Sequence, residues 1–320
     1  MNPSTDGPSN AEGKSKATSS SEAISKYVKD GDTVFLGGFG NLYPFALAHE
    51  VIRQRKTNLT LAKHSPELIG DQMIGAGCLS KVIFSWLGNP GVGSSHCFRR
   101  AVEKKVPRGL ELEEYTHAAV TAMLRAGATG VPFMATKTLL GSDILGLEQS
   151  KRARVIDDPF TGEKVTLMRA LEPDVALIHA QRADPSGNVQ AWGVVSDIRD
   201  GAFASKKVVV SVDELVSEET VRRDPGRTLI PSFKADAVVV EPFGAHPSAC
   251  QGYYDRDNDF FIEYESSTRT VDGFDAFMDR WVFGVKDRKE YVAKLLGADR
   301  VRRLTPGECA SGQVNYGLYS

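Results

Sequence analysis

The chain has 320 residues, of which 41% are hydrophobic and 25% charged, and its formal net charge at pH 7 is -2. These values are typical of a globular protein with one large α/β domain or two small ones. The charge balance gives no reason to expect a nucleic-acid partner, and no apolar run approaches the roughly 20 residues of a membrane span. The four cysteines are widely spaced without a CxxC pair. This pattern favours reduced cysteines in the cytoplasm over disulfides or a zinc site, so we expect no bound metal and no membrane partner.

The two ends of the chain differ in composition from its middle. Residues 1–21 are mostly small and polar and lack the apolar segment of a signal peptide, which predicts a disordered extension. Residues 305–320 are similar, and we expect a flexible tail there. The segment 22–304 is then the one folded domain.

Strand-like and helix-like segments alternate along this domain. The apolar runs predict strands at 33–38, 58–63, 81–86, 110–113, 174–179, 207–212 and 236–240. Apolar residues at helical spacing predict helices at 45–55, 67–74, 96–105, 116–128, 272–283 and 289–296. The later strands are rich in Val and Ile with little alternation, which is typical of parallel strands covered on both faces. The segment 154–168, with Pro-Phe-Thr-Gly at its centre, predicts a β-hairpin. We therefore expect an α/β fold with a mainly parallel sheet, helices on both faces and one inserted hairpin.

The first strand leads directly into a glycine-rich turn, Gly37, Gly38, Phe39 and Gly40, which we call the glycine loop. Glycine permits positive φ angles and lets a ligand approach the backbone closely. The start of the next helix is expected to offer free N–H groups to an anion or a carbonyl oxygen. In open α/β sheets, ligands bind at the carboxyl ends of the strands, where this loop would lie. The alternative is a tight strand–helix turn without a ligand, and the spacing matches neither dinucleotide nor P-loop motifs.

The stretch 30–44, DGDTVFLGGFGNLYP, resembles the signature of alpha subunits of family I CoA-transferases. The rest of the chain is most similar to the alpha subunit of glutaconate CoA-transferase. The segments that carry this resemblance are 179–181, 183–189, 192–193, 219–225, 242–248, 253–255 and 281–283. It covers residues 22–304. One departure is the segment 61–70, LAKHSPELIG, where the glutaconate enzyme has a loop richer in Gly and Ala.

The resemblance implies a transferase that takes a coenzyme A thioester as substrate and binds no metal or redox cofactor. In the family, a beta-subunit glutamate attacks the acyl-CoA and forms covalent intermediates. That glutamate typically stands in a Ser-Glu-Asn-Gly motif, which this chain lacks; its one Glu-Gly pair, at Glu12, lies in the predicted extension, and Glu67 is in a different context. The resemblance therefore implies a beta-subunit partner, in a heterodimer or an α₂β₂ assembly, and no catalytic residue in this chain. The glycine loop would contribute to a shared site, and Gly38→Val is expected to close it.

Two further groups are candidates for the site. Glu114 directly follows the expected strand at 110–113 and could serve as a general base, or it could be part of an exposed acidic strand end. Ser94, Ser95 and Arg99 gather at the start of a predicted helix, where hydroxyls and a cation suit a substrate carboxylate or a CoA phosphate. A capped surface helix explains them equally well.

Histidines complete the candidates, and three functions stay open. His246 could contact substrate or a partner and His179 ends a buried strand, although a structural role is the simpler interpretation for each. The first function is CoA transfer to a short-chain dicarboxylic or 3-oxo acid. The second is hydrolysis of a CoA-activated ring compound, with Glu114 as the base. The third is a non-catalytic scaffold subunit.

Overall fold

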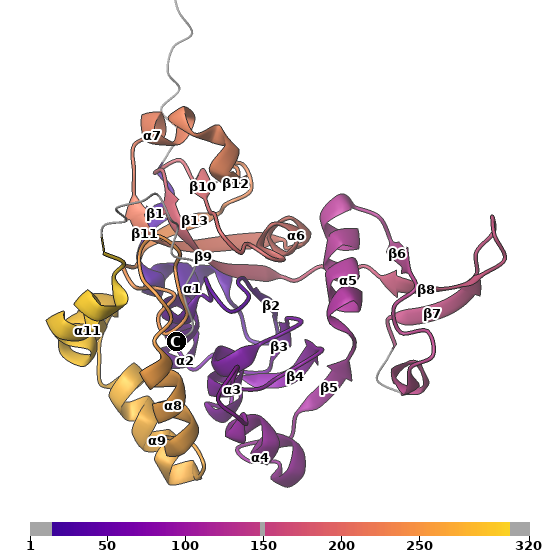
Figure 1. Cartoon of the computed structure of the whole chain (residues 1–320), viewed down its shortest axis with the longest axis horizontal. Helices are drawn as coiled ribbons and strands as arrows, with labels where there is room; N and C mark the ends of the chain where they lie inside the picture. The colour runs from indigo at the N-terminus through magenta and orange to yellow at the C-terminus, as the bar shows by residue number, and fades with distance from the viewer. Residues whose placement is uncertain (1–14, 148–150, 308–320) are drawn as a thin grey trace, which may run out of the picture.

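A mainly parallel sheet forms the centre of the computed structural model, which describes residues 15–147 and 151–307. Its strand order is β1-β13-β11-β9-β2-β3-β4-β5, and all neighbours along this path are parallel (Figure 1). The strands are β1 Ala17–Thr18, β2 Thr33–Leu36, β3 Leu59–Ala62, β4 Leu79–Phe84, β5 Glu111–Glu114, β9 Val175–Ala183, β11 Lys207–Leu215 and β13 Ala237–Val240. Two short strands extend the sheet antiparallel: β10 Val189–Gln190 pairs with β9, and β12 Thr228–Ile230 pairs with β10. The predicted fold class is confirmed.

Helices cover both faces of the sheet because successive strand residues point to opposite sides. Val34 and Leu36 lie in one core and Phe35 in the other. The first core contains α1 Ser20–Tyr27, α2 Phe45–Arg53, α3 Glu67–Gly75, α4 His96–Lys104, α8 Asn258–Ser267 and α9 Val271–Met278. The second contains α5 His117–Thr129 and α6 Ile198–Ala204. Both faces of β2 are therefore buried, as its apolar sequence predicts.

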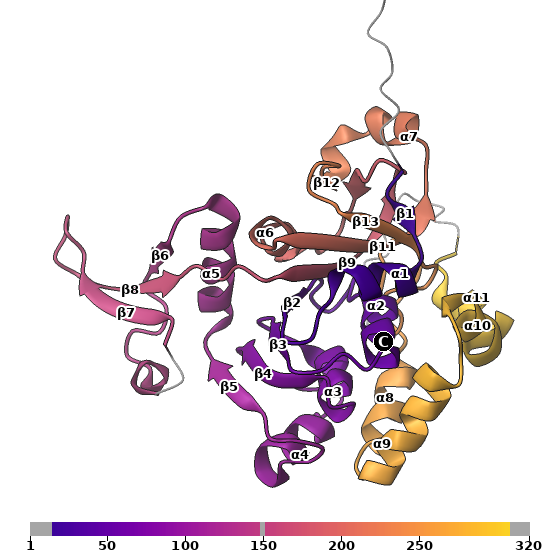
Figure 2. The ribbon, with the colours of Figure 1, turned by 180° about the vertical axis from the view of Figure 1, so that it is seen from behind.

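A small antiparallel sheet projects from the main body beside α5 (Figure 2). Its order is β6-β8-β7, with β6 Phe133–Thr136, β7 Ala153–Asp157 and β8 Lys164–Arg169. The predicted hairpin is the β7–β8 pair. The third strand, β6, was not predicted from the sequence; it pairs with β8 through its backbone.

Several boundaries differ from the sequence-based expectations. The fold begins before residue 22, because Ala17 and Thr18 pair with β13 at the edge of the sheet.

The helix expected at 272–283 is α9 followed by a π-helical turn, Asp279–Phe283. The helix expected at 289–296 is α10 Arg288–Tyr291, followed by a second such turn, Val292–Leu296. A further helix, α11 Gly297–Leu304, follows. It was not predicted, nor were α1, α6, α7 Glu218–Arg223 and α8. Residues 1–14 and 308–320, which hold most of the expected extension and tail, lie outside the described residues. Among the described helices, none has the length and apolar character needed to cross a membrane.

The packing of α6 on β2 gives a test of the fold. A Cβ at Gly201 would lie 2.1 Å from Cε1 of the fully buried Phe35. Gly→Ala inside a helix usually stabilises a protein by about 0.5–1 kcal/mol, but overpacking costs about 1–3 kcal/mol. We expect Gly201→Ala to lower the urea midpoint of unfolding. Gly226→Ala, where a Cβ meets nothing within 4 Å, is the control and should leave the midpoint nearly unchanged.

Candidate functional site

The glycine loop follows β2 at the carboxyl edge of the sheet, as predicted. Gly37 donates its N–H to the Leu177 carbonyl at 2.9 Å, and Phe39 donates to the Asn41 carbonyl at 3.0 Å. Gly38 has a φ of 95°. A Cβ at Gly38 would lie 2.4 Å from the Asn41 carbonyl oxygen. A side chain at this position would therefore disrupt the loop itself rather than fill the space in front of it.

The start of α2 is closed within the chain, and the expectation that it offers free N–H groups is wrong. The Phe45 N–H donates to the Tyr43 carbonyl at 2.8 Å, and the Ala46 N–H donates to the Gly244 carbonyl at 2.9 Å. Both residues are at most 5% exposed. The helix start is thus packed under the segment that contains Gly244, which leaves no opening for an anion at these two groups.

The loop is also bound to the segment that follows β13. Leu42 donates its N–H to the Ala249 carbonyl at 2.8 Å, and the Asn41 side-chain amide donates to the Gln251 side chain. The backbone carbonyl of Gln251 accepts a hydrogen bond from the side-chain amide of Gln181, at 3.2 Å. Segments far apart in the sequence are thereby joined around the glycine loop.

A buried ion pair lies beside the loop, after the end of β3. The Lys63 ammonium is 2.6 Å and 2.8 Å from the two carboxylate oxygens of Asp197, and neither side chain is more than 1% exposed. The next residue, His64, is 3.0 Å from the same carboxylate through Nε2. Burial alone would raise the pKa of Asp197, but the Lys63 charge and the His64 contact hold it below its usual value. Burial, followed by the Lys63 charge, lowers the pKa of His64, which is therefore neutral near pH 7.

Aromatic and hydroxyl groups lie next to His64, between this buried pair and the surface. The Phe39 ring lies edge-on to His64 at 5.3 Å and to His117 at 6.0 Å between ring centroids. The two histidine rings are 5.0 Å apart. His117, at the start of α5, is exposed, and its Nδ1 lies 2.6 Å from the hydroxyl of Ser85, which follows β4. Side chains from the ends of β2, β3, β4 and β5 thus meet at one place.

Glu67 supports the glycine loop from below. It is 5% exposed, and its Oε1 accepts the Gly40 N–H at 3.3 Å. Its own backbone has a φ of 50°, a strained value for a residue with a side chain. Burial raises the pKa of Glu67 to about 7, although hydrogen bonds from Tyr43 and Gly40 and the charges of Lys63 and Arg256 oppose this effect. The carboxyl group therefore titrates near neutral pH.

The other predicted candidates lie at separate places. Glu114 is the exposed last residue of β5, at the same edge of the sheet as the loop. Ser94 is exposed, whereas Ser95 is buried before α4 and its hydroxyl has no hydrogen-bond partner among the described residues. Arg99 is paired with Glu103 at 3.2 Å.

The start of α4 is already capped by a buried carboxylate. Asp71 Oδ1 accepts the Phe98 N–H at 2.7 Å, and Oδ2 accepts the Cys97 N–H at 3.4 Å. This carboxylate occupies the position where a bound anion would meet the first turn. The contact favours the interpretation of Ser94, Ser95 and Arg99 as part of a capped helix.

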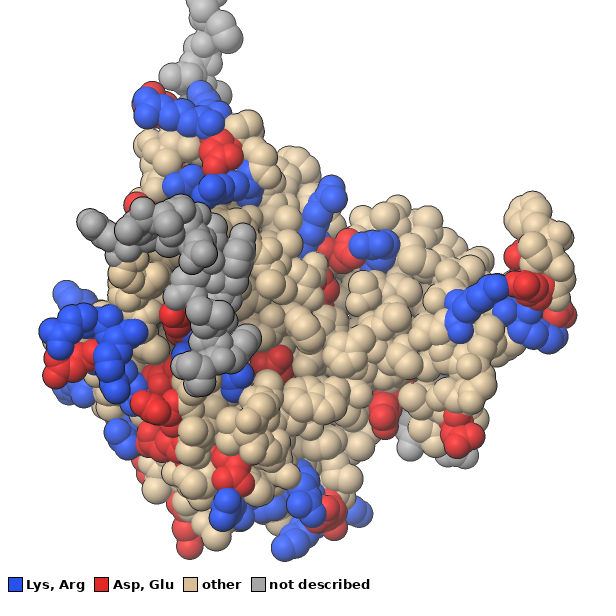
Figure 3. All heavy atoms as spheres, viewed as in Figure 1, with Lys and Arg blue, Asp and Glu red and all other residues tan. Residues whose placement is uncertain are grey.

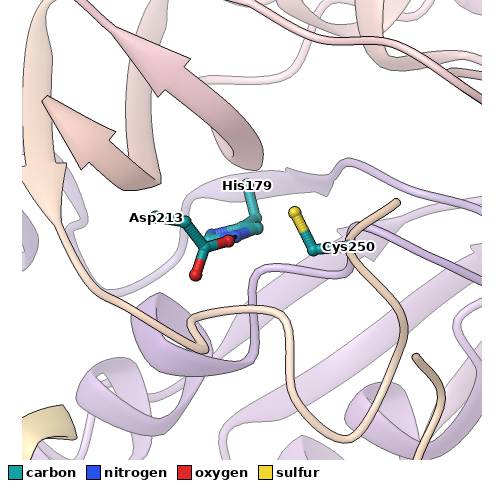
Figure 4. Close-up of side chains that lie close together, drawn as sticks. All are labelled: His179, Asp213 and Cys250. Carbon is teal, nitrogen blue, oxygen red and sulfur yellow. Dashed lines mark hydrogen bonds and ion pairs between the residues drawn. The ribbon is translucent and has the colours of Figure 1, made fainter. Parts of the chain in front are cut away.

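Within the described ranges, one group of side chains has potential metal ligands close together, namely His179, Asp213 and Cys250 (Figure 4). Their ligand atoms all lie within 4.8 Å of one another. Both His179 nitrogens already have protein partners, Ser211 at 2.9 Å and Asp213 at 2.8 Å. Asp213 also accepts the Phe243 N–H at 2.6 Å, and burial raises the pKa of Cys250 well above its usual value. These bonds make the group a structural link between β9, β11 and the segment after β13.

His246 is likewise part of an internal network. It is fully buried, with Nδ1 2.8 Å from the Tyr291 hydroxyl and Nε2 2.7 Å from Asp257. Asp257 is also paired with Arg300. The structural interpretation of His246 is the one these contacts favour.

The glycine loop does not line a closed cavity. A cavity of about 820 Å³ lies elsewhere, among α1, α2 and α10, and no residue of the loop lines it. Phe39 is 41% exposed, and Trp86, after β4, is 42% exposed. In Figure 3 charged side chains gather over α7, α11, α4 and the hairpin, whereas the area toward which β3, β4 and β5 point in Figure 1 is mostly uncharged.

The sequence-based reasoning did not select Lys63, His64, Ser85 and His117, and it set Glu67 aside. A signal was available, because each of these residues follows closely on, or ends, a predicted strand of a parallel sheet.

Exchange of a loop glycine tests the loop geometry. Gly38→Ala is expected to lower kcat/KM of the assembled complex by at least about tenfold, because the new Cβ meets backbone atoms that cannot move cheaply. Gly31→Ala is the matched control, since Gly31 has a similar φ of 88° but no atom within 4 Å of a Cβ. Equal activity of the two variants would show that the loop shape does not matter for turnover.

The pKa of Glu67 predicts a dependence of stability on pH. Its folded-state pKa lies above that of the unfolded chain, so stability is full below about pH 4.5 and falls as the pH rises to about 7. At about 1.4 kcal/mol per pKa unit, the loss is on the order of 3 kcal/mol. Glu67→Gln should therefore raise the free energy of unfolding at pH 8 and change it little at pH 4.

Chemical denaturation at the two pH values measures this difference. Glu50→Gln is the control, because Glu50 is also buried but is ion-paired with Arg53, and its loss should not stabilise the protein at pH 8. A Glu67→Gln variant that is less stable than the wild type at pH 8 would contradict the prediction.

Comparisons with known proteins agree with the resemblance seen in the sequence. The model of the family described as Coenzyme A transferase matches residues 17–241. The chain is 42% identical over 274 residues to the A-type subunit of 3-oxoadipate CoA-transferase from Pseudomonas knackmussii, covering 86% of this chain and 96% of that relative. It is 39% identical over 306 residues to the A-type subunit of glutaconate CoA-transferase from Acidaminococcus fermentans, covering 91% and 94%.

The crystal structure of glutaconate coenzyme A-transferase from Acidaminococcus fermentans has the same fold. It matches with a TM-score of 0.86 and 37% identity, covering 92% of this chain and 96% of that one. The family match spans more than half of the chain, and both relatives are covered almost completely. The chain belongs to the coenzyme A transferase family.

Proposed function

We propose that this chain is the alpha subunit of a hetero-oligomeric CoA-transferase, which moves coenzyme A between an acyl-CoA and a short-chain dicarboxylic or 3-oxo acid. Two relatives are named as the A-type chains of CoA-transferases for 3-oxoadipate and glutaconate. Both names describe short dicarboxylic acids, and the first also contains a 3-oxo group. The beta subunit, in a heterodimer or an α₂β₂ assembly, supplies the nucleophilic glutamate.

The state of Glu67 is the observation that carries this proposal. A nucleophilic carboxylate must be accessible to the thioester carbon. Glu67 is the carboxylate bonded to the glycine loop, but it is 5% exposed and its oxygen is used by the Gly40 N–H. The chain thus brings a shaped loop to an open edge without an accessible carboxylate bonded to it, which fits a nucleophile from the partner.

The proposed reaction is an exchange in balanced covalent steps. The partner's glutamate attacks the thioester carbonyl, the carbon–sulfur bond breaks, and an acyl-glutamyl anhydride and the CoA thiolate form. The thiolate then attacks the glutamyl carbonyl, releasing the acyl group as a free carboxylate and leaving an enzyme–CoA thioester. An acceptor carboxylate reverses both steps. The alpha chain positions the acyl group at the glycine loop and excludes water from the anhydride.

Exposed apolar groups support a partner at this side of the chain. Phe39, in the glycine loop, and Trp86, after β4, are each more than 40% exposed. On the projecting sheet, Phe133 is 47% and Phe160 95% exposed. Contiguous apolar patches on a surface commonly mark protein–protein contacts, and we infer that these residues belong to such a contact. A beta subunit covering them would close the open edge into a dry site.

Covalent trapping tests the proposal. The chain is purified with its native partner, incubated with acyl-CoA, and treated with borohydride or hydroxylamine, and the modified residue is located by mass spectrometry. We expect no turnover by the isolated chain and a modified glutamate on the partner, because the thioester intermediate forms there.

Two other results would replace the proposal. Turnover without any adduct favours the hydrolase, in which the exposed Glu114 at the end of β5 acts as the base; Glu114→Gln should then abolish activity. No turnover with a broad panel of acyl-CoA donors favours a scaffold subunit.

A further inference from the structure

Ser85 and His117 form a hydrogen-bonded pair that the exchange chemistry leaves unused. Their side chains meet at 2.6 Å through Oγ and Nδ1, after the ends of the adjacent strands β4 and β5. His117 is exposed and Ser85 is partly exposed, so a ligand can reach both. An exposed pair of this kind, beside the glycine loop, is placed to contact the acyl group rather than to support the core.

The pair offers a hydrogen-bond donor in either neutral tautomer of His117. If Nδ1 accepts the Ser85 hydroxyl proton, Nε2 carries a proton that it can donate. If Nδ1 carries the proton and donates it to Ser85, the Ser85 hydroxyl is free to donate. In both cases one donor remains for an oxygen atom of a ligand.

The surroundings keep this donor uncharged. Although His117 is exposed, the partial burial of its ring lowers its pKa. The neighbouring His64 and the Lys63 charge lower this pKa further, against the opposing charge of Asp197. The Lys63 charge is itself fully buried and neutralised by Asp197. The pair therefore suits an uncharged oxygen, since a carboxylate would find no free positive charge among these groups.

The position of the pair fixes which part of the acyl group it meets. His117 and the loop residue Phe39 are 6.0 Å apart between ring centroids. In an acyl group whose carbonyl lies at the loop, the third carbon is two bonds from the reacting carbon, and the oxygen on it is three bonds away. An oxygen on the third carbon therefore stays close enough to the loop for this donor to reach it.

We propose that Ser85 and His117 determine acyl specificity by donating a hydrogen bond to an uncharged oxygen on the third carbon of the acyl group. This inference rests on the proposed CoA-transferase function, and it favours 3-oxo acids over simple dicarboxylic acids. A site built to bind such an oxygen disfavours an analogue that lacks it, because its polar groups would stay unpaired.

A matched pair of donors tests the inference in the assembled complex. Acetoacetyl-CoA and butyryl-CoA have acyl groups of the same length and differ in the oxygen on the third carbon. We expect Ser85→Ala and His117→Phe to lower kcat/KM for acetoacetyl-CoA by about 10- to 100-fold and for butyryl-CoA by less than about threefold. The phenylalanine keeps the aromatic contact with Phe39, and Ser85→Thr, which keeps the hydroxyl, should retain most of the preference.

Controls separate this effect from a general loss of structure. Ser80 lies near the start of β4, at the opposite end of the strand from Ser85, and its hydroxyl contacts the carbonyls of Asn58 and Leu59. Ser80→Ala should leave the ratio unchanged. Equal losses with both donors, or no loss, would overturn the inference. A selective loss with glutaryl-CoA would also overturn it, by assigning the pair to a carboxylate. Failure of the wild-type complex to transfer CoA from any donor would instead overturn the proposed function on which the inference depends.

Discussion

The buried ion pair between Lys63 and Asp197 is the contact on which the arrangement of the site depends. It joins the end of β3 to the residue that precedes α6, and so holds these two elements together. Removing one partner of such a pair typically costs about 3–5 kcal/mol, because the remaining charge is left buried and uncompensated. The aromatic rings of Phe35 and Tyr43 lie 5.2 Å and 5.8 Å from the Lys63 ammonium and complete its enclosure.

Burial and this ion pair together set the charge state of the neighbouring histidine. Asp197 compensates the positive charge on Lys63, while burial and the Lys63 charge lower the pKa of His64 against the opposing effect of Asp197. His117 stands in the same field and is neutral for a related reason. The group formed by Lys63, His64, Ser85 and His117 is consequently polar but without an uncompensated charge, which supports the proposal that it meets an acyl group rather than a phosphate.

The glycine loop is held from two sides by contacts of different kinds. Backbone bonds to Leu177 and Ala249 fix the position of its ends, while Glu67 contacts Gly40 from a strained backbone conformation. Strain of this kind is retained where the surrounding structure requires it. The segment 61–70, in which the sequence departs from the glutaconate pattern, supplies Lys63, His64 and Glu67. The departure therefore falls on residues that contact the glycine loop or lie beside it. Under the proposed function, this is where two enzymes with different substrates would be expected to differ.

The sequence by itself determined the fold class, the glycine loop and the family. Apolar runs of strand length, helical spacing between them and the motif around Gly38 are local signals, and each is readable without knowledge of its neighbours in space. Only the tertiary structure decided which polar residues share a site. Lys63, Ser85 and His117 are far apart in the sequence and match no motif; they meet because parallel pairing of β3, β4 and β5 brings the ends of these strands to one edge. For the same reason the sequence did not show that the pKa of Glu67 is raised or that the N–H groups at the start of α2 are already bonded. Burial and partners from distant segments decide both properties.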